Sequence, residues 1–236
     1  MIYMNNTNFN NFIMKIIFMH YSKYSTLLFF LMVCSSLYAQ VPVRQEPHHK
    51  TVLQNDYIRL LDVHIKPGDT TLYHIHAAPS VMVHITKSII GIQMMGKAIM
   101  PPSEVLQGKT SFAAYDENPI THRVYNAGKN VFHVMDIELV KKQPSANSCP
   151  ALQIPGAVIT IDEKLARVYK FDIAEQQLIN LPAGMCAHLV ICITGEIITN
   201  GKRISAGKYL FFDPDSKVSF TNKQNDNATC VVLELK

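Results

Sequence analysis

Residues 58–65 read "IRLLDVHI", and a stretch of the same length and pattern, "ARVYKFDI", follows at 166–173. The shift of 108 residues places Arg59 over Arg167. Both stretches are short, rich in apolar and β-branched side chains, and bounded by turn residues, which is typical of strands. Short β-prone runs of this kind recur along the rest of the chain, so the sequence predicts an all-β fold.

Further matches follow in the same order. The shift of 108 residues also lays "VMVHIT" (81–86) over "LVICIT" (189–194) without a gap, and near the end of each copy Asn126 matches Asn222 at a shift of 96. One apolar match between two strands arises by chance. The common order of all of them predicts one unit used twice, the second shorter by 12 residues, which is the difference between the two shifts.

The first copy contains a cluster of candidate metal ligands. Residues 68–76 read "GDTTLYHIH", and because successive side chains of a strand point to opposite faces, His74 and His76 share one face. Two imidazoles need a third ligand to hold a metal. The stretch "PITHRVYN" (119–126) offers His122.

These residues resemble the two motifs of the cupin superfamily. Gly68 followed by five residues, His74, one residue and His76 fits the first motif, G(X)5HXH, and His122 with Asn126 fits the end of the second motif, PXXHXXXN. The internal repeat extends the resemblance to a bicupin. It implies two double-stranded β-helix (jelly-roll) barrels in tandem, with a divalent transition metal held in the first barrel by the three histidines.

The chain departs from the family pattern at one ligand. Ser80 and Val81 stand where the complete motif carries a glutamate. A three-histidine site resembles the thiol dioxygenase branch of cupins, and it favours Fe, Zn or Ni over the oxygen-preferring Mn. The acidic residues Glu104, Asp116 and Glu117 lie in intervening loops, and the sequence does not place them.

The second copy lacks the ligand set. In the ungapped register the HXH pair falls on Pro182 and Gly184, and the third histidine falls on Val218, while His188 stands alone. We therefore expect the second barrel to be structural, packing against the first barrel or closing its mouth.

Five other histidines stay outside the predicted site. His64, His84 and His133 lie in expected strands, and a lone strand histidine is more often hydrogen-bonded or exposed than a ligand. His48 and His49 lie in a polar segment that we expect to be mobile.

The N-terminus has the features of an export signal. Lys15 and Lys23 precede the apolar run "TLLFFLMVC" (26–34), and "SSLYAQ" offers cleavage after Ala39. The apolar run is shorter than the roughly 20 residues of a membrane span. We expect a periplasmic or extracellular protein. The sequence leaves open whether the chain starts at Met1 or at Met14.

The expected domain organisation has five parts. Residues 1–39 are a signal peptide, 40–50 a mobile N-terminal arm, 51–140 the N-terminal cupin domain with the metal site, 141–156 a linker, and 157–236 the C-terminal cupin domain without a metal motif.

Charge argues against a nucleic-acid partner. The formal net charge of the whole chain is +4. The expected signal peptide carries two lysines and no acidic residue, so the rest has 20 basic and 18 acidic residues, a net charge of +2. No cluster of Lys and Arg indicates nucleic-acid binding.

Four cysteines remain after the expected cleavage: Cys149, Cys186, Cys192 and Cys230. In an exported protein they permit disulfides, with three complete pairings. Cys186 and Cys192 lie six residues apart in one β-prone run, about 20 Å along a strand, which is beyond the reach of a bridge. A bridge is therefore expected to use Cys149 or Cys230; small buried apolar side chains are the alternative.

The sequence is compatible with three classes of function. The first is a metal-dependent enzyme on a small oxygenated substrate, dioxygenase-like chemistry included; the second is a non-catalytic module that binds a small molecule or a metal; the third is a structural protein with a decayed site. The complete histidine set argues against the third class. We expect the first class, with the second as the alternative. In either case we expect a small molecule as ligand or substrate. We expect no nucleic-acid partner and no transmembrane span. The sequence leaves a homodimer open.

Overall fold

The computed structural model describes residues 40–140, 149–182, 184 and 186–236. The expected signal peptide, with both candidate starts, lies outside the described residues, and so does the first half of the expected linker. The described residues form strands and one short 3-10 helix, η1 (Val43–Gln45). None of these residues forms a helix long and apolar enough to cross a membrane.

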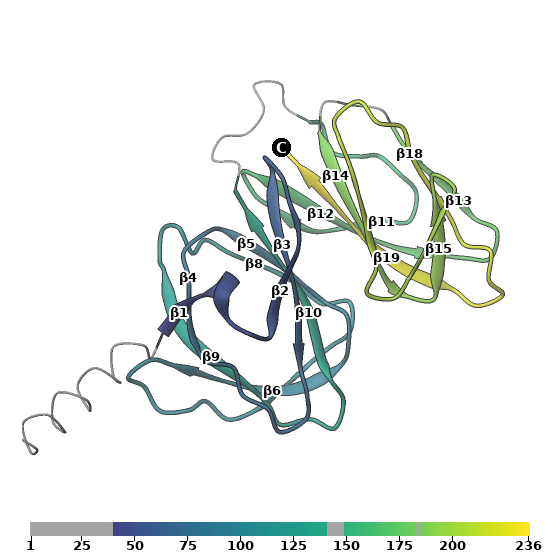
Figure 1. The fold of residues 1–236 in the computed structure, drawn as a ribbon. Helices are drawn as coiled ribbons and strands as arrows, with labels where there is room; N and C mark the ends of the chain where they lie inside the picture. Colours follow the sequence, from purple (N-terminus) through teal and green to yellow (C-terminus); the bar gives the residue numbers. More distant parts are fainter. Residues whose placement is uncertain (1–39, 141–148, 183, 185) are drawn as a thin grey trace, which may run out of the picture. The chain divides into compact units, whose positions relative to one another are not determined.

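The first barrel is built from two sheets, with strand orders β1-β4-β9-β6-β7 and β2-β3-β10-β5-β8. Figure 1 shows its strands in purple to teal. Their bounds are β1 (Gln40–Pro42), β2 (His49–Gln54), β3 (Ile58–Ile65), β4 (Tyr73–His76), β5 (Ser80–His84), β6 (Ser88–Met94), β7 (Ser103–Val105), β8 (Thr110–Ala113), β9 (Ile120–Asn126) and β10 (Phe132–Leu139).

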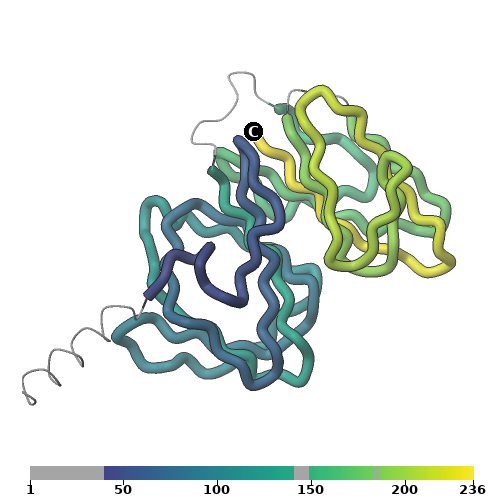
Figure 2. Tube along the Cα trace, in the orientation of Figure 1, coloured from purple at the N-terminus to yellow at the C-terminus, as the bar shows by residue number. Residues whose placement is uncertain are grey.

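The second barrel has the sheets β11-β12-β19-β14-β17 and β13-β18-β15-β16. Its strands are β11 (Ala157–Asp162), β12 (Ala166–Ile173), β13 (Leu178–Leu181), β14 (Ala187–Thr194), β15 (Glu196–Thr199), β16 (Lys202–Ser205), β17 (Tyr209–Phe212), β18 (Val218–Thr221) and β19 (Ala228–Leu235). Figure 2 follows the chain through the first barrel before it enters the second, and the sheets exchange no strand.

Apart from β1, which has no counterpart in the second barrel, the two barrels have the same topology, as the internal repeat predicts. The repeated stretches form β3 and β12, and each pairs antiparallel with the last strand of its own barrel, β10 or β19. Matching ion pairs join these strands: Arg59 donates to Glu138 at 2.6 Å, and Arg167 donates to Glu234 at 2.8 Å. The prediction of an all-β fold with two jelly-roll barrels in tandem is confirmed.

A buried asparagine holds the same turn in each barrel. Asn126 Nδ2 donates to the carbonyl of Ile65 at 2.8 Å, and Asn222 Nδ2 donates to the carbonyl of Ile173 at 3.0 Å. Each amide also donates to the carbonyl four residues further on. The motif asparagine thus satisfies carbonyls that would otherwise be buried without a partner.

Three hydrophobic clusters stabilise the fold by removing apolar surface from water. One lies inside the first barrel and one inside the second. The third contains side chains of both barrels, from the outer faces of β3, β10 and β5 and of β12, β14 and β19, so the second barrel packs against the first. Its members include Leu60, Val83, Ile137, Val168, Leu189 and Leu233.

Residues 40–50 belong to the first barrel, which corrects our expectation of a mobile arm. β1 joins the sheet of β4 and β9, and β2 pairs with β3. Val43 and Glu46 are 3% and 1% exposed. The polar composition was misleading because the buried polar groups of this segment find hydrogen-bond partners that cannot be read from the sequence.

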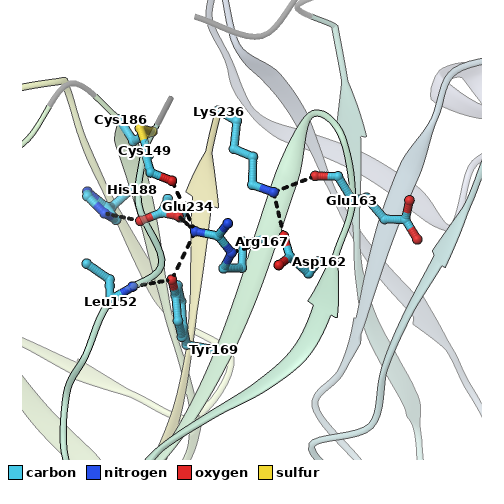
Figure 3. The surroundings of a disulfide bond; sticks show 10 residues. All are labelled: Cys149, Leu152, Asp162, Glu163, Arg167, Tyr169, Cys186, His188, Glu234 and Lys236. Atoms are coloured by element: carbon cyan, nitrogen blue, oxygen red, sulfur yellow. Dashed lines mark hydrogen bonds and ion pairs between the residues drawn. A yellow bond between two sulfur atoms is a disulfide. The ribbon is translucent and has the colours of Figure 1, made fainter. Parts of the chain in front are cut away.

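One disulfide joins Cys149 to Cys186, whose Cα atoms are 6.2 Å apart. This agrees with the prediction that a bridge would use Cys149 or Cys230. Cys192 and Cys230 are buried free thiols. Figure 3 shows the bridge near Arg167, which donates to the carbonyl of Cys149 at 3.3 Å. Residues 149–156, the second half of the expected linker, are thereby attached to the second barrel.

Candidate metal centre

His74 and His122 face each other across two neighbouring strands. β4 and β9 pair antiparallel in a register that sets His74 opposite His122. Both side chains are buried, and their Nε2 atoms lie 3.1 Å apart. Two nitrogens bound to one zinc ion at about 2.0–2.1 Å are roughly 3 Å from each other. The pair therefore has the spacing of two ligands of one ion.

His76 joins this pair from the same strand as His74. It lies two residues later and turns to the same face, and its ring centre is 5.0 Å from those of both other rings. Gly68, the motif glycine before β4, has a φ of 81°, a conformation that favours glycine. The three histidines of the sequence motif thus converge inside the first barrel.

Burial keeps these imidazoles neutral at neutral pH. Desolvation, with smaller contributions from neighbouring imidazoles, lowers the pKa of His74 to about 4, of His76 to about 2 and of His122 to about 3. His74 Nδ1 donates to the carbonyl of Leu72 at 2.8 Å, so the lone pair of this ring lies on Nε2, the atom that faces His122. A neutral imidazole oriented in this way is the form that binds a transition metal.

A fourth imidazole, which the sequence analysis missed, reaches the same place. His49 is 8% exposed, and its ring centre lies 4.7 Å from that of His74 and 6.4 Å from that of His76. One ligand nitrogen from each of these three residues lies within 4.8 Å of the other two. His49 Nδ1 lies 2.6 Å from Glu46 Oε2. The sequence offered only two adjacent histidines in a polar segment, which is a weak signal.

Asp136 on β10 is the carboxylate closest to the motif histidines in the cavity wall. Its Oδ2 atom lies 3.5 Å from His76 Nδ1, and burial raises its pKa to about 7. The sequence signal, an acidic residue in an apolar strand, was present but was not used. The loop residues considered from the sequence, Glu104, Asp116 and Glu117, are exposed instead.

These side chains line a cavity of about 390 Å³ in the first barrel. His84, which the sequence analysis left out, also lines it, and its buried Nδ1 has no hydrogen-bond partner among the described protein atoms. Tyr115 lies against His76 with ring centres 5.0 Å apart. An apolar cavity with a few convergent polar groups is typical of a small-molecule site. Its apolar wall includes Val63, Ile65, Met82, Ile90, Ile92, Val124 and Phe132.

His64 and His133 lie away from the cavity, on the opposite face of β3 and β10. Their rings stack at 3.9 Å, and Asp62 Oδ1 lies 2.7 Å from His133 Nε2 and 3.6 Å from His64 Nδ1. The positive charge of Lys208 acts on both Asp62 and His64, which opposes the binding of a cation here. This group is an ion-pair network on the outer face of the barrel.

The second barrel has apolar residues at the ligand positions. β13 pairs with β18 so that Leu181 lies opposite Val218, as His74 lies opposite His122 in the first barrel. Leu181, rather than Pro182, is therefore the structural counterpart of His74, because the connection before β13 is one residue shorter than the ungapped register assumed. His188 is buried next to Glu234, with 3.8 Å between Nε2 and Oε2.

No protein-family model and no curated protein matches the sequence. Solved structures do match. The bacterial pirin YhhW from Escherichia coli, in complex with nickel(II), has a TM-score of 0.57 at 14% identity, covering 82% of this chain and 96% of that chain. AerE from Microcystis aeruginosa has a TM-score of 0.55 at 13% identity, with coverages of 81% and 98%.

A salicylate 1,2-dioxygenase from Pseudaminobacter salicylatoxidans is also similar, with a TM-score of 0.54 at 9% identity, covering 76% of this chain and 71% of that chain. At such low identities the likeness establishes the fold alone. The structural neighbours are cupin-family proteins, and this chain has their fold.

Proposed function

We propose that this protein is an exported metal-binding bicupin whose first barrel holds a divalent transition metal with His74, His76 and His122. The observation that carries the proposal is the 3.1 Å separation of the Nε2 atoms of His74 and His122 at the wall of the cavity. Imidazole ligands without the motif glutamate favour Fe, Zn or Ni over Mn. The nickel(II) complex of YhhW, a protein of the same fold, is consistent with this choice.

We propose further that the protein is an enzyme on a small oxygenated substrate, of a dioxygenase-like kind. A metal in this place would supply a Lewis acid or a redox centre beside the substrate. The chain contributes two features: an apolar wall that limits the access of water, and the Asp136 carboxyl, which lies 3.5 Å from His76 Nδ1 without a hydrogen bond between them. Tyr115, against His76, borders the space where a substrate would lie.

The alternative is a non-catalytic module that holds a small molecule or a metal without turnover. The mostly apolar cavity wall favours it, because it offers few groups that could transfer a proton. Metal analysis separates the two: iron in the purified protein supports the enzyme, whereas a metal-free protein that still binds small ligands supports the binding module.

Export is proposed on two grounds. The N-terminal sequence has the pattern of a signal peptide, and the bridge between Cys149 and Cys186 fits an oxidising compartment. Intact-mass analysis of the exported product should show a chain that begins at Gln40. A product that keeps residues 26–34 would contradict cleavage after Ala39.

The metal proposal is tested with tag-free protein, because a His-tag would bind metal itself. We expect about one ion per chain in the wild type, loss of most of it in His76→Ala, and wild-type content in the control His188→Ala, whose side chain is buried in the other barrel. Circular dichroism should show the same β content in all three proteins. Equal metal content in wild type and His76→Ala, or loss in His188→Ala, would overturn the proposed site.

A further inference from the structure

We infer that His49 is a fourth ligand of this metal and that Glu46 is its positioning residue. The inference rests on the proposed metal site and adds to it a ligand from outside both sequence motifs. Its starting point is that residues 43–49 fold into the first barrel, which brings His49 to the rings of His74 and His76.

The orientation of His49 is set by one carboxylate. Glu46 is 1% exposed and accepts four hydrogen bonds, so that neither oxygen is left without a donor. The donors are His49 Nδ1 at 2.6 Å, His48 Nδ1 at 2.9 Å, the backbone N–H of His48 at 2.7 Å and the backbone N–H of Leu72 at 3.1 Å. A negative charge so placed keeps the proton of His49 on Nδ1.

The tautomer leaves the other nitrogen of His49 as a metal-binding atom. With Nδ1 donating to Glu46, Nε2 carries the lone pair, which is the arrangement by which a carboxylate fixes and strengthens an imidazole ligand. His49 contributes one atom to the group of three ligand nitrogens, with His74 and His76, that lie within 4.8 Å of one another. A side chain that only filled space would not need to place a nitrogen this close to the nitrogens of His74 and His76.

Glu46 also ties this ligand to a motif ligand. The backbone N–H of Leu72 donates to Glu46, and the carbonyl of Leu72 accepts the Nδ1 proton of His74. The carboxylate of Glu46 and the backbone of Leu72 thus orient imidazoles from β2 and β4 toward the same interior. The carboxylate supplies next to His49 the negative charge that the missing motif glutamate would supply as a ligand.

The consequence is a site with four imidazole nitrogens. A fourth nitrogen further favours Zn, Ni or Cu over oxygen-preferring ions. It leaves two positions free on a six-coordinate ion and none on a tetrahedral one, so the coordination number decides whether substrate can reach the metal directly.

The test compares tag-free wild type, His49→Gln, Glu46→Gln and the control His48→Ala. His48 donates to the same carboxylate, but its side chain is 26% exposed and its ring is not one of the clustered ligands. Zinc affinity is measured by competition with a chelator. The amide of Glu46→Gln has no negative charge and, in either orientation, turns an N–H₂ group toward two of the four donors. We therefore expect a loss of about 10–100-fold, and at least as much in His49→Gln. His48→Ala should stay near wild type.

A second readout separates a ligand from a packing residue. In the copper(II)-loaded protein, the number of nitrogens coupled to copper in pulsed electron paramagnetic resonance should fall by one in His49→Gln and remain unchanged in His48→Ala. If His49→Gln keeps the wild-type affinity and nitrogen count, His49 is no ligand, while the three-histidine site stands. If the wild type itself binds no metal, both this inference and the proposed site are wrong. If His49→Gln does not fold, the coupled nitrogen count in wild type, four or three, decides.

Discussion

The first and second barrels share one strand order, apart from the additional β1 of the first, and differ in what fills their interiors. In the second barrel Phe171 and Phe220 are almost completely buried in its hydrophobic cluster. The matching positions of the first barrel hold the smaller Val63 and Val124, which line the cavity instead. The same scaffold can therefore be packed or hollow, because its sheets, turns and outer cluster do not depend on the interior side chains.

The polar positions follow the same division. The pair of His74 and His122 in the first barrel is replaced by Leu181 and Val218 in the second, and Asp136 is replaced by a valine. Small apolar residues around a polar cluster give a site, whereas large apolar residues give a core. Function in this protein is thus proposed for the barrel with less internal packing.

The largest expected effect on stability comes from changing the interior side chains at the matching positions of the two barrels. Phe220→Ala opens a void in a packed core and should lower the free energy of unfolding by about 3–5 kcal/mol. The reciprocal change Val124→Phe extends into an existing cavity and should leave stability unchanged or raise it by about 1 kcal/mol. Urea unfolding measures both. A cost for Val124→Phe as large as that for Phe220→Ala would show that the first interior is already full.

A smaller difference is expected between the matched ion pairs. Arg167 donates to Glu234 and Asp162, and its removal leaves Glu234 buried without its main partner, at a cost of about 3 kcal/mol. Arg59, with a side chain 17% exposed, is closer to water, and Arg59→Met should cost about 1.5–2 kcal/mol. Thermal or urea unfolding of Arg167→Met and Arg59→Met gives the comparison. Equal losses of unfolding free energy would mean that the difference in burial does not affect how much each ion pair contributes to stability.

The smallest difference is expected at the two turn asparagines. Asn126→Ala and Asn222→Ala each remove two hydrogen bonds to carbonyl oxygens, and each should lower the free energy of unfolding by about 1–3 kcal/mol. The bonds that the two amides donate match, and the bonds that they accept differ only by the Ser88 hydroxyl on Asn126 Oδ1, so the two costs should agree to within about 1 kcal/mol. A clear inequality in urea unfolding would mean that the two turns, although alike in geometry, are not equally important.

The strand pattern and the internal repeat were sufficient to predict an all-β chain with one unit used twice, and the resemblance to cupins added the jelly-roll barrels. The match of 58–65 with 166–173 depends on side-chain character alone, and it gave the bounds of β3 and β12 correctly. The sequence also identified His74, His76 and His122, because a strand places residues two apart on one face and the second motif marks the partner strand. The structure brings these three together, and the binding of a metal by them stays a prediction.

Other features could not be read from the chain. His49 and Glu46 form a buried hydrogen-bonded pair in a segment whose composition indicates a polar arm. Contacts with β3, with Leu72 and with β4 explain its burial. The counterpart of His74 in the second barrel depends on the length of the connection before β13. The pairing of β13 with β18 identifies this counterpart as Leu181. Asp136 looked like any acidic residue in a strand.

By itself, the sequence determined the all-β class, the two copies of one unit and the histidines of the motif, since these follow from local periodicity and from spacing. Only the tertiary structure decided which barrel is hollow, that the segment before residue 50 contributes to its wall, and which of Cys149, Cys186, Cys192 and Cys230 are bridged. Such features are sums over side chains that meet from distant parts of the chain. Their volumes and hydrogen bonds become definite only when the strands have packed.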